Sequence, residues 1–181
     1  MNSSLRRAPL GRMIAAAAFA SFAALASLPA AAQESTNRVS AMTDWIVFVE
    51  NSPKECWGVS SPKKTVNTLN GKPADVRRGE ILLFVTHRPG KKPEVTFTGG
   101  YPFAKGSTVE LKIDGKTFQL LTDGEWAWPA TGDEDAKILA AMKAGSSATL
   151  GARSGRGTQT LDTFSLKGFT AAVNDAAKRC G

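Results

Sequence analysis

The chain has 181 residues, of which 42% are hydrophobic, and its formal net charge is +7 at pH 7. That length suits one domain with a core of its own, and the charge excess is too small to indicate a nucleic-acid-binding protein. No apolar run reaches the roughly 20 residues that span a bilayer.

Residues 1–32 have the composition of a secretory signal. Arginines at positions 6, 7 and 12 precede an alanine-rich apolar run from Met13 to Leu28, and Pro29 to Ala32 supplies small residues for a signal peptidase. We place the cleavage after Ala32. Removing these 32 residues leaves 149 and, because the segment carries three arginines and no acid, lowers the net charge to +4. The sequence therefore predicts an exported protein without a transmembrane span.

The remainder of the chain reads mainly as short strands. Residues 33–43 are polar and aperiodic, so we expect a flexible leader before a domain over 44–181. β-branched and aromatic residues, alternating or in short apolar runs, predict the strands that follow. Their ranges are 44–50, 56–60, 80–86, 94–98, 108–113, 116–121, 148–153 and 158–166, with one edge strand within 61–79. Within 80–86 the residues from Ile81 to Val85 form an unbroken apolar run, which predicts a strand buried on both faces.

Three local signals fix the rest of the pattern. Asp114-Gly115 between two alternating segments predicts a tight β-hairpin. Thr131 with Glu134 three residues on forms a capping-box pattern, so a helix should begin there and end at Gly145. A second helix is predicted from Phe169 to Cys180, because its apolar residues share one face. Eight or nine strands in antiparallel order, with two short helices, indicate a mainly β protein built as a two-sheet sandwich.

Cys56 and Cys180 are the two cysteines of the chain. In an exported protein they are expected to pair, and closing a loop of this length stabilises by roughly 5 kcal/mol in the chain-entropy account. Free buried thiols and pairing to another chain are the alternatives.

No reactive constellation stands out. His87 is the single histidine and we expect it to be exposed or hydrogen-bonded, since a zinc site needs three or four ligands. A triad of Ser154, His87 and Asp162 can be written down, but its spacing does not support it. We predict a protein without enzymatic activity, metal or cofactor.

Two stretches are candidate binding sites. Arg153, Ser154 and Arg156 flank a Gly-rich turn whose backbone N–H groups could form a concave anion site; the alternative is a plain hairpin turn that uses glycine for positive φ. Trp126 and Trp128 share one face of an extended segment and could form a sugar or peptide platform, or simply pack at the rim of the core.

Several stretches, in order along nearly the whole predicted mature chain, resemble the invasion-associated locus B family of bacterial exported proteins. They are Asp44-Trp45, Ser52 to Trp57, Val85 to Pro89, Gly100 to Phe103, Ile113 to Gly115, Ala127 to Pro129, Ala141 to Gly145 and Ser154 to Ala171. The resemblance implies an immunoglobulin-like antiparallel β-sandwich, in the periplasm or at the outer surface of a Gram-negative cell or secreted, in a family named for host-cell invasion. Trp57 adjoins Cys56 instead of following it by a dozen residues, so the likeness to antibody domains is one of architecture.

Two functions follow as expectations. The first is a non-enzymatic envelope or cell-surface protein that binds or supports an envelope or host component, either a protein or a polymer. The second is a periplasmic small-ligand or glycan-binding module that uses the Gly-rich arginine turn and the tryptophan face.

Overall fold

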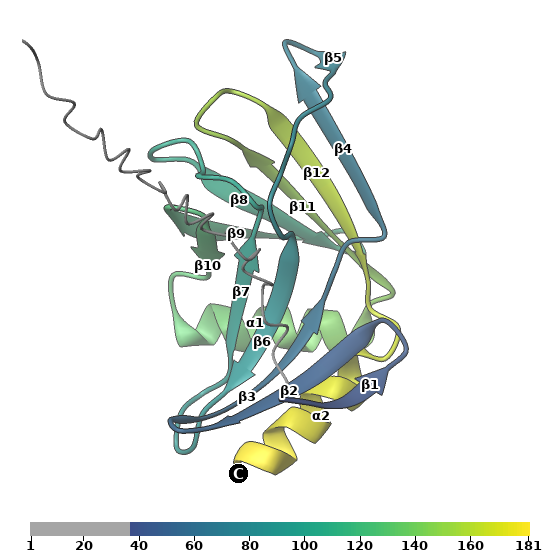
Figure 1. Ribbon diagram of the computed structural model, residues 1–181, viewed down its shortest axis with the longest axis vertical. Helices are drawn as coiled ribbons and strands as arrows, with labels where there is room; N and C mark the ends of the chain where they lie inside the picture. The colour runs from purple at the N-terminus through teal and green to yellow at the C-terminus, as the bar shows by residue number, and fades with distance from the viewer. Residues whose placement is uncertain (1–36) are drawn as a thin grey trace, which may run out of the picture. The chain divides into compact units, whose positions relative to one another are not determined.

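Twelve strands in residues 37–181, the part of the chain that the computed structural model describes, form one hydrogen-bonded antiparallel sheet (Figure 1). Its strand order is β1-β2-β3-β6-β7-β10-β9-β8-β11-β12-β4-β5. The first strands are β1 Arg38–Met42, β2 Trp45–Asn51, β3 Lys54–Ser60, β4 Lys64–Leu69, β5 Lys72–Pro73 and β6 Leu82–His87. The others are β7 Glu94–Thr98, β8 Thr108–Ile113, β9 Lys116–Asp123, β10 Trp126–Trp128, β11 Ser147–Arg153 and β12 Gln159–Ser165. The predicted signal, 1–32, lies outside the described residues.

The sheet folds over on itself to make the two layers of the predicted sandwich. The three-residue strand β10 joins the layers, because it pairs with β7 on one side and with β9 on the other. Phe97 of β7 and Phe164 of β12 meet edge to face, with ring centroids 6.2 Å apart. The indole N–H of Trp45 in β2 donates to the carbonyl of Ser165 at 3.0 Å. The mainly β sandwich is therefore confirmed, with its two layers continuous through β10.

The hairpin and the first helix form as their sequence signals predict. Asp114 and Gly115 have φ values of 42° and 85°, the left-handed pair that a two-residue turn between β8 and β9 requires. Helix α1, Gly132–Ala144, begins after Thr131, whose side chain accepts a hydrogen bond from the Glu134 N–H. The Glu134 carboxylate accepts in return from the Ala130 N–H at 3.0 Å.

Helix α2, Phe169–Cys180, closes the fold by packing on β2 and β3. It buries the apolar face predicted for it, including Phe169, whose ring meets Trp45 at a centroid distance of 4.8 Å. Gly168 precedes the helix with φ 87°, and a Cβ there would lie 1.8 Å from the Met42 carbonyl oxygen. Only glycine therefore fits where α2 starts beside β1.

Two sequence expectations are corrected here. Of the flexible leader predicted for residues 33–43, positions 33–36 lie outside the described residues, whereas Arg38–Met42 form strand β1, because this backbone pairs with β2 and Ser40 donates to Asp175 of α2. The strand predicted to be buried on both faces, β6, has one buried face, with Leu83 and Val85, while Phe84 on the other face is only partly covered. The sequence of β6 shows no alternation of polar and apolar residues, because both faces of the strand carry apolar side chains, so its exposed face could not be predicted.

Candidate functional site

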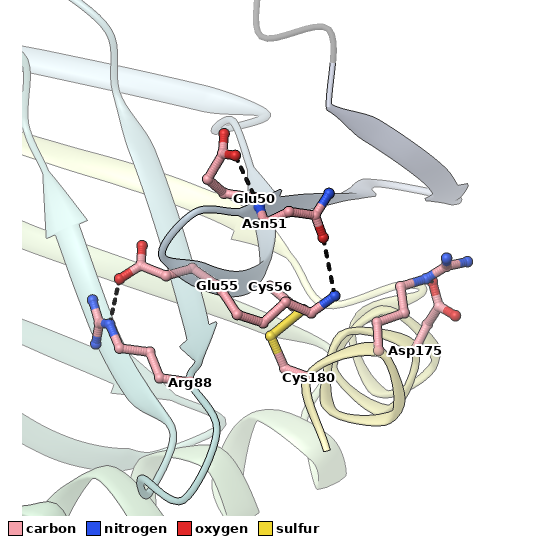
Figure 2. Close-up of a disulfide and its surroundings, with 9 residues drawn as sticks. Glu50, Asn51, Glu55, Cys56, Arg88, Asp175 and Cys180 are labelled. Atoms are coloured by element: carbon pink, nitrogen blue, oxygen red, sulfur yellow. Dashed lines mark hydrogen bonds and ion pairs between the residues drawn. A yellow bond between two sulfur atoms is a disulfide. The ribbon is translucent and has the colours of Figure 1, made fainter.

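A disulfide between Cys56 of β3 and Cys180 of α2 ties the last helix to the sheet (Figure 2). The Cα atoms are 5.8 Å apart, within the usual range for a disulfide, and both residues are buried. The predicted intramolecular pairing is confirmed. The bond joins positions 124 residues apart, so it holds the start and the end of the domain together.

His87 lies beside this disulfide, directly opposite Cys56 across the β3–β6 pairing. Its Nε2 atom is buried and has no hydrogen-bond partner among residues 37–181, so the expectation of an exposed or hydrogen-bonded histidine is wrong for this atom. Burial lowers the pKa of His87, and the nearby charge of Lys143 lowers it further. Burial acts in this direction because it disfavours the charged form of the imidazole.

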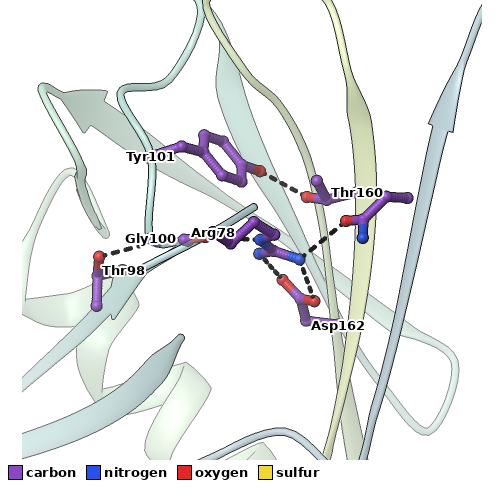
Figure 3. A network of polar contacts seen from close by, with 8 residues as sticks. Arg78, Thr98, Gly100, Tyr101, Thr160 and Asp162 are labelled. Atoms are coloured by element: carbon purple, nitrogen blue, oxygen red, sulfur yellow. Dashed lines mark hydrogen bonds and ion pairs between the residues drawn. The ribbon is translucent and has the colours of Figure 1, made fainter. Parts of the chain in front are cut away.

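A buried ion pair ties the opposite part of the sheet together (Figure 3). The Arg78 guanidinium donates to both carboxylate oxygens of Asp162 on β12, at 2.8 and 2.6 Å, and their side chains are only 6% and 0% exposed. It also donates to the Gly99 carbonyl and to the Asn67 side chain on β4. One side chain thus connects the 74–81 segment to two strands and to the loop after β7.

The loop after β7 completes this cluster. Tyr101 lies under the Arg78 guanidinium, 5.0 Å from its carbon to the ring centroid, and shares a hydrogen bond with the Thr160 hydroxyl at 2.5 Å. Burial raises the pKa of the Tyr101 hydroxyl. Gly100 has φ 71°; its N–H donates to the Thr98 hydroxyl at 3.3 Å, and its carbonyl accepts from the Gly79 N–H at 2.9 Å. No local sequence pattern indicates that Arg78 pairs with an aspartate 84 positions away.

The Gly-rich turn is held by its own backbone. The N–H groups of Ser154, Gly157 and Thr158 all donate within the turn or its ends, and that of Gly155 donates to the Pro102 carbonyl. These donors are therefore not free to surround an anion. The side chains of Arg153 and Arg156 are both exposed, but they lie at different places. Arg156 borders a cavity together with Ser154, whereas Arg153 lies with the outward-facing residues of β11 and β12.

That cavity, here called the polar cavity, has a volume of about 530 Å³ and lies where four segments of the chain meet. Its walls come from the 75–78 segment, the 100–102 loop, Glu125 and the 154–160 turn and strand start. The Arg78 and Tyr101 side chains of the buried cluster form part of its lining. The sequence indicated Ser154 and Arg156 but gave no sign that the 75–78 segment returns to meet them.

The tryptophans lie on a separate surface, the outward side of β10. Trp126 and Trp128 are 46% and 39% exposed, while Ala127 between them is buried, so the two indoles share a face as predicted. Leu121, opposite Trp128 on β9, is 47% exposed. The Phe84 ring of β6 lies 6.0 Å from that of Trp126. We call Phe84, Leu121, Trp126 and Trp128 the outer aromatic face.

The three residues of the hypothetical triad are engaged separately. Asp162 is bound by Arg78, the Ser154 hydroxyl accepts from the Thr158 N–H at 3.1 Å, and no hydrogen bond joins His87 to either within residues 37–181. Over the same residues, no group of three or more His, Cys, Asp or Glu side chains is placed to hold a metal ion. Nor does any helix of this part of the chain have the length and apolar character to cross a membrane.

The family model described as "Invasion associated locus B (IalB) protein" matches residues 52–177 of this sequence. The chain belongs to the IalB family. This confirms the resemblance found on the short stretches between Ser52 and Ala171. The match begins at the turn between β2 and β3 and ends within α2, so it takes in the Arg78 cluster, the polar cavity and the outer aromatic face.

A solved structure similar to this IalB-family chain is described as invasion associated protein B from Bartonella henselae. It is 18% identical, with a TM-score of 0.52, over 77% of this chain and 95% of that chain. At this identity the likeness concerns the fold. No curated protein sequence matches the chain.

Proposed function

We propose that the chain is an exported, non-enzymatic envelope or cell-surface protein that binds or supports an envelope or host component through its outer aromatic face. Membership of the IalB family supports a role linked to invasion or to the cell surface. The buried disulfide supports an oxidising compartment, because such bonds persist outside the cytoplasm. The signal-like composition of residues 1–32 supports export.

The observation that carries the binding proposal is the exposure of large apolar side chains side by side on β9 and β10. Trp126, Trp128 and Leu121 are each 39–47% exposed, although the sandwich has an interior that buries residues of this kind. Contiguous exposed apolar groups on a folded protein mark interaction sites, and tryptophan contributes most among interface residues. A protein or polymer partner that covers this face would gain apolar burial without any change in the fold.

The test is chemical crosslinking and pull-down from intact cells. The wild type is compared with Trp126→Ser/Trp128→Ser and with Leu161→Ser, which changes another exposed apolar pair, Leu161 of β12 opposite Val66 of β4, at 46% and 39% exposure. We expect the tryptophan variant to lose the captured partner while the Leu161 variant retains it. Equal capture by all three proteins would contradict the assignment of the face, and turnover of a substrate that depends on one polar residue would contradict the non-enzymatic proposal.

A second candidate function, the small-ligand or glycan-binding module, is favoured by the polar cavity beside Ser154 and Arg156. A ligand-binding function based on the polar cavity does not require Trp126 and Trp128, which lie on another surface. The crosslinking comparison separates the two functions, because Arg153→Ala/Arg156→Ala should leave capture through the outer aromatic face unchanged.

A further inference from the structure

The floor of the polar cavity is made of hydroxyl groups. Ser154, Thr158 and Thr160 are buried residues that line it, together with the partly buried Tyr101. Several of their hydrogen-bonding positions are unused. The Ser154 hydroxyl accepts from the Thr158 N–H and keeps its own hydrogen to donate, whereas the Tyr101 and Thr160 hydroxyls are bonded to each other. Because a hydroxyl both donates and accepts, this floor suits a ligand whose groups do the same.

The rim of the cavity carries charges of both signs. Arg77 and Arg156 supply two guanidiniums, Asp75 and Glu125 supply two carboxylates, and all four residues are exposed. None of the four takes part in an ion pair among residues 37–181. The other cation of the lining, Arg78, is neutralised by Asp162. The cavity as a whole is therefore close to electrically neutral.

This charge balance selects between ligand classes. A phosphate or a carboxylate is an anion and would be repelled by two unpaired carboxylates at the rim. An amine only donates and would meet two unpaired guanidiniums. A sugar hydroxyl donates to a carboxylate and accepts from a guanidinium or a second hydroxyl, so a run of neighbouring hydroxyls can use every group that the cavity presents.

We infer that the polar cavity binds a short, electrically neutral saccharide. This inference rests on the second candidate function and gives it a ligand class. Arg156 and Glu125, a donor and an acceptor in the same lining, bind neighbouring sugar hydroxyls, and Thr158 and Ser154 bind the hydroxyls that reach the buried part of the cavity. The volume of about 530 Å³ lies within the range of about 300–1,000 Å³ found for small-molecule sites. The buried Arg78 cluster fixes the floor in place, since its Tyr101 and Thr160 hydroxyls are already bonded to each other.

The experiment titrates the purified protein with defined probes while its amide resonances are followed by NMR. The neutral probes are maltose, lactose and diacetylchitobiose; the others are digalacturonate, the dipeptide Gly-Gly and inorganic phosphate. We expect at least one neutral disaccharide to shift the amide signals of Gly100, Gly155 and Arg156, with saturation. Arg156→Ala should weaken that binding roughly tenfold, the loss of one charge-assisted hydrogen bond. Thr158→Val should weaken it by a smaller factor.

Arg153→Ala is the matched control, because Arg153 is an exposed arginine three positions from Arg156 whose side chain lies outside the cavity. It should bind the saccharide as the wild type does. Saturable binding of phosphate, digalacturonate or Gly-Gly in preference to the neutral sugars would overturn the ligand class. The absence of any saturable shift at the cavity with all six probes would overturn the site, and neither outcome would affect the proposal for the outer aromatic face.

Discussion

Two long-range ties hold this sandwich, and they use opposite chemistry. At one, a disulfide joins Cys56 of β3 to Cys180 of α2 among buried apolar residues. At the other, the Arg78 guanidinium joins the 74–81 segment to Asp162 of β12, 84 residues away, through polar contacts alone. The disulfide stabilises the fold by restricting the unfolded chain. The ion pair stabilises it only while both partners are present, because a buried charge without its counter-charge lowers the free energy of unfolding. The binding surfaces proposed above lie beside the second tie or on the outer face, away from the disulfide.

The largest effect is expected from breaking the covalent tie. Cys56→Ala/Cys180→Ala should lower the free energy of unfolding by about 5 kcal/mol in the chain-entropy account, since it opens a loop of 124 residues. Urea unfolding of the variant and of the oxidised wild type gives the difference. A loss below about 1 kcal/mol would mean that packing of α2, and not the disulfide, keeps the helix in place.

Breaking the ionic tie should cost nearly as much. Asp162→Asn keeps the shape of the side chain but leaves the Arg78 charge buried without a counter-charge, which we expect to cost about 3–4 kcal/mol in the same urea experiment. The control is Arg78→Met/Asp162→Leu, which removes both charges and should recover most of that loss. If the single and double variants are equally unstable, packing and not the buried charge is what this region requires.

The pH dependence of stability tests the region around the disulfide in particular, because His87 lies opposite Cys56 in the sheet. Its pKa is lowered by burial and then by Lys143, so between the folded pKa and the ordinary value of about 6.5 the unfolded chain binds the proton more readily. The contribution of neutral His87 to the free energy of unfolding is therefore present in full above the ordinary pKa. It is lost as the pH falls through the lower pKa of the folded protein. We expect urea unfolding at pH 5.5 to show lower stability than at pH 7.5. In His87→Phe this decrease should be smaller, and an identical decrease in both proteins would rule out His87 as its cause.

The smallest effect is expected at a surface ion pair. Lys92 and Asp133 are 3.1 Å apart, but their side chains are 74% and 83% exposed, so water and salt screen their attraction. Lys92→Ala should change the urea midpoint by less than the equivalent of about 0.5 kcal/mol. A cost comparable with that of Asp162→Asn would show that burial is not what makes the Arg78 pair important.

The sequence predicts one tie and misses the other, for a physical reason. The chain has two cysteines, so once an oxidising compartment is expected from the signal-like composition of residues 1–32, the Cys56–Cys180 pairing has few alternatives. Arg78 is one of many basic residues, and Asp162 lies in a strand that looks alternating in any case, so no local pattern marks them as a pair. The same limit applies to β1, because its apolar Val39 and Ala41 are exposed while the polar Ser40 is partly buried, and the segment is extended because it pairs with β2.

The candidate sites show the same division. Trp126 and Trp128 could be placed on one face from their spacing alone, and Ser154 and Arg156 from the glycines around them. What could not be predicted is that Arg153 and Arg156, three residues apart, border different surfaces, or that the 75–78 segment closes the cavity. Both depend on how loops that are distant in sequence meet, which is set by the strand order and not by composition.

The most direct test of an exported scaffold closed by its own disulfide is the intact mass of the protein isolated from cells without reduction, after free thiols have been alkylated. The account predicts a single chain that starts at Gln33, carries no alkyl group and lacks the two thiol hydrogens of Cys56 and Cys180. A mass that retains residues 1–32, or one that shows both cysteines alkylated, would contradict it.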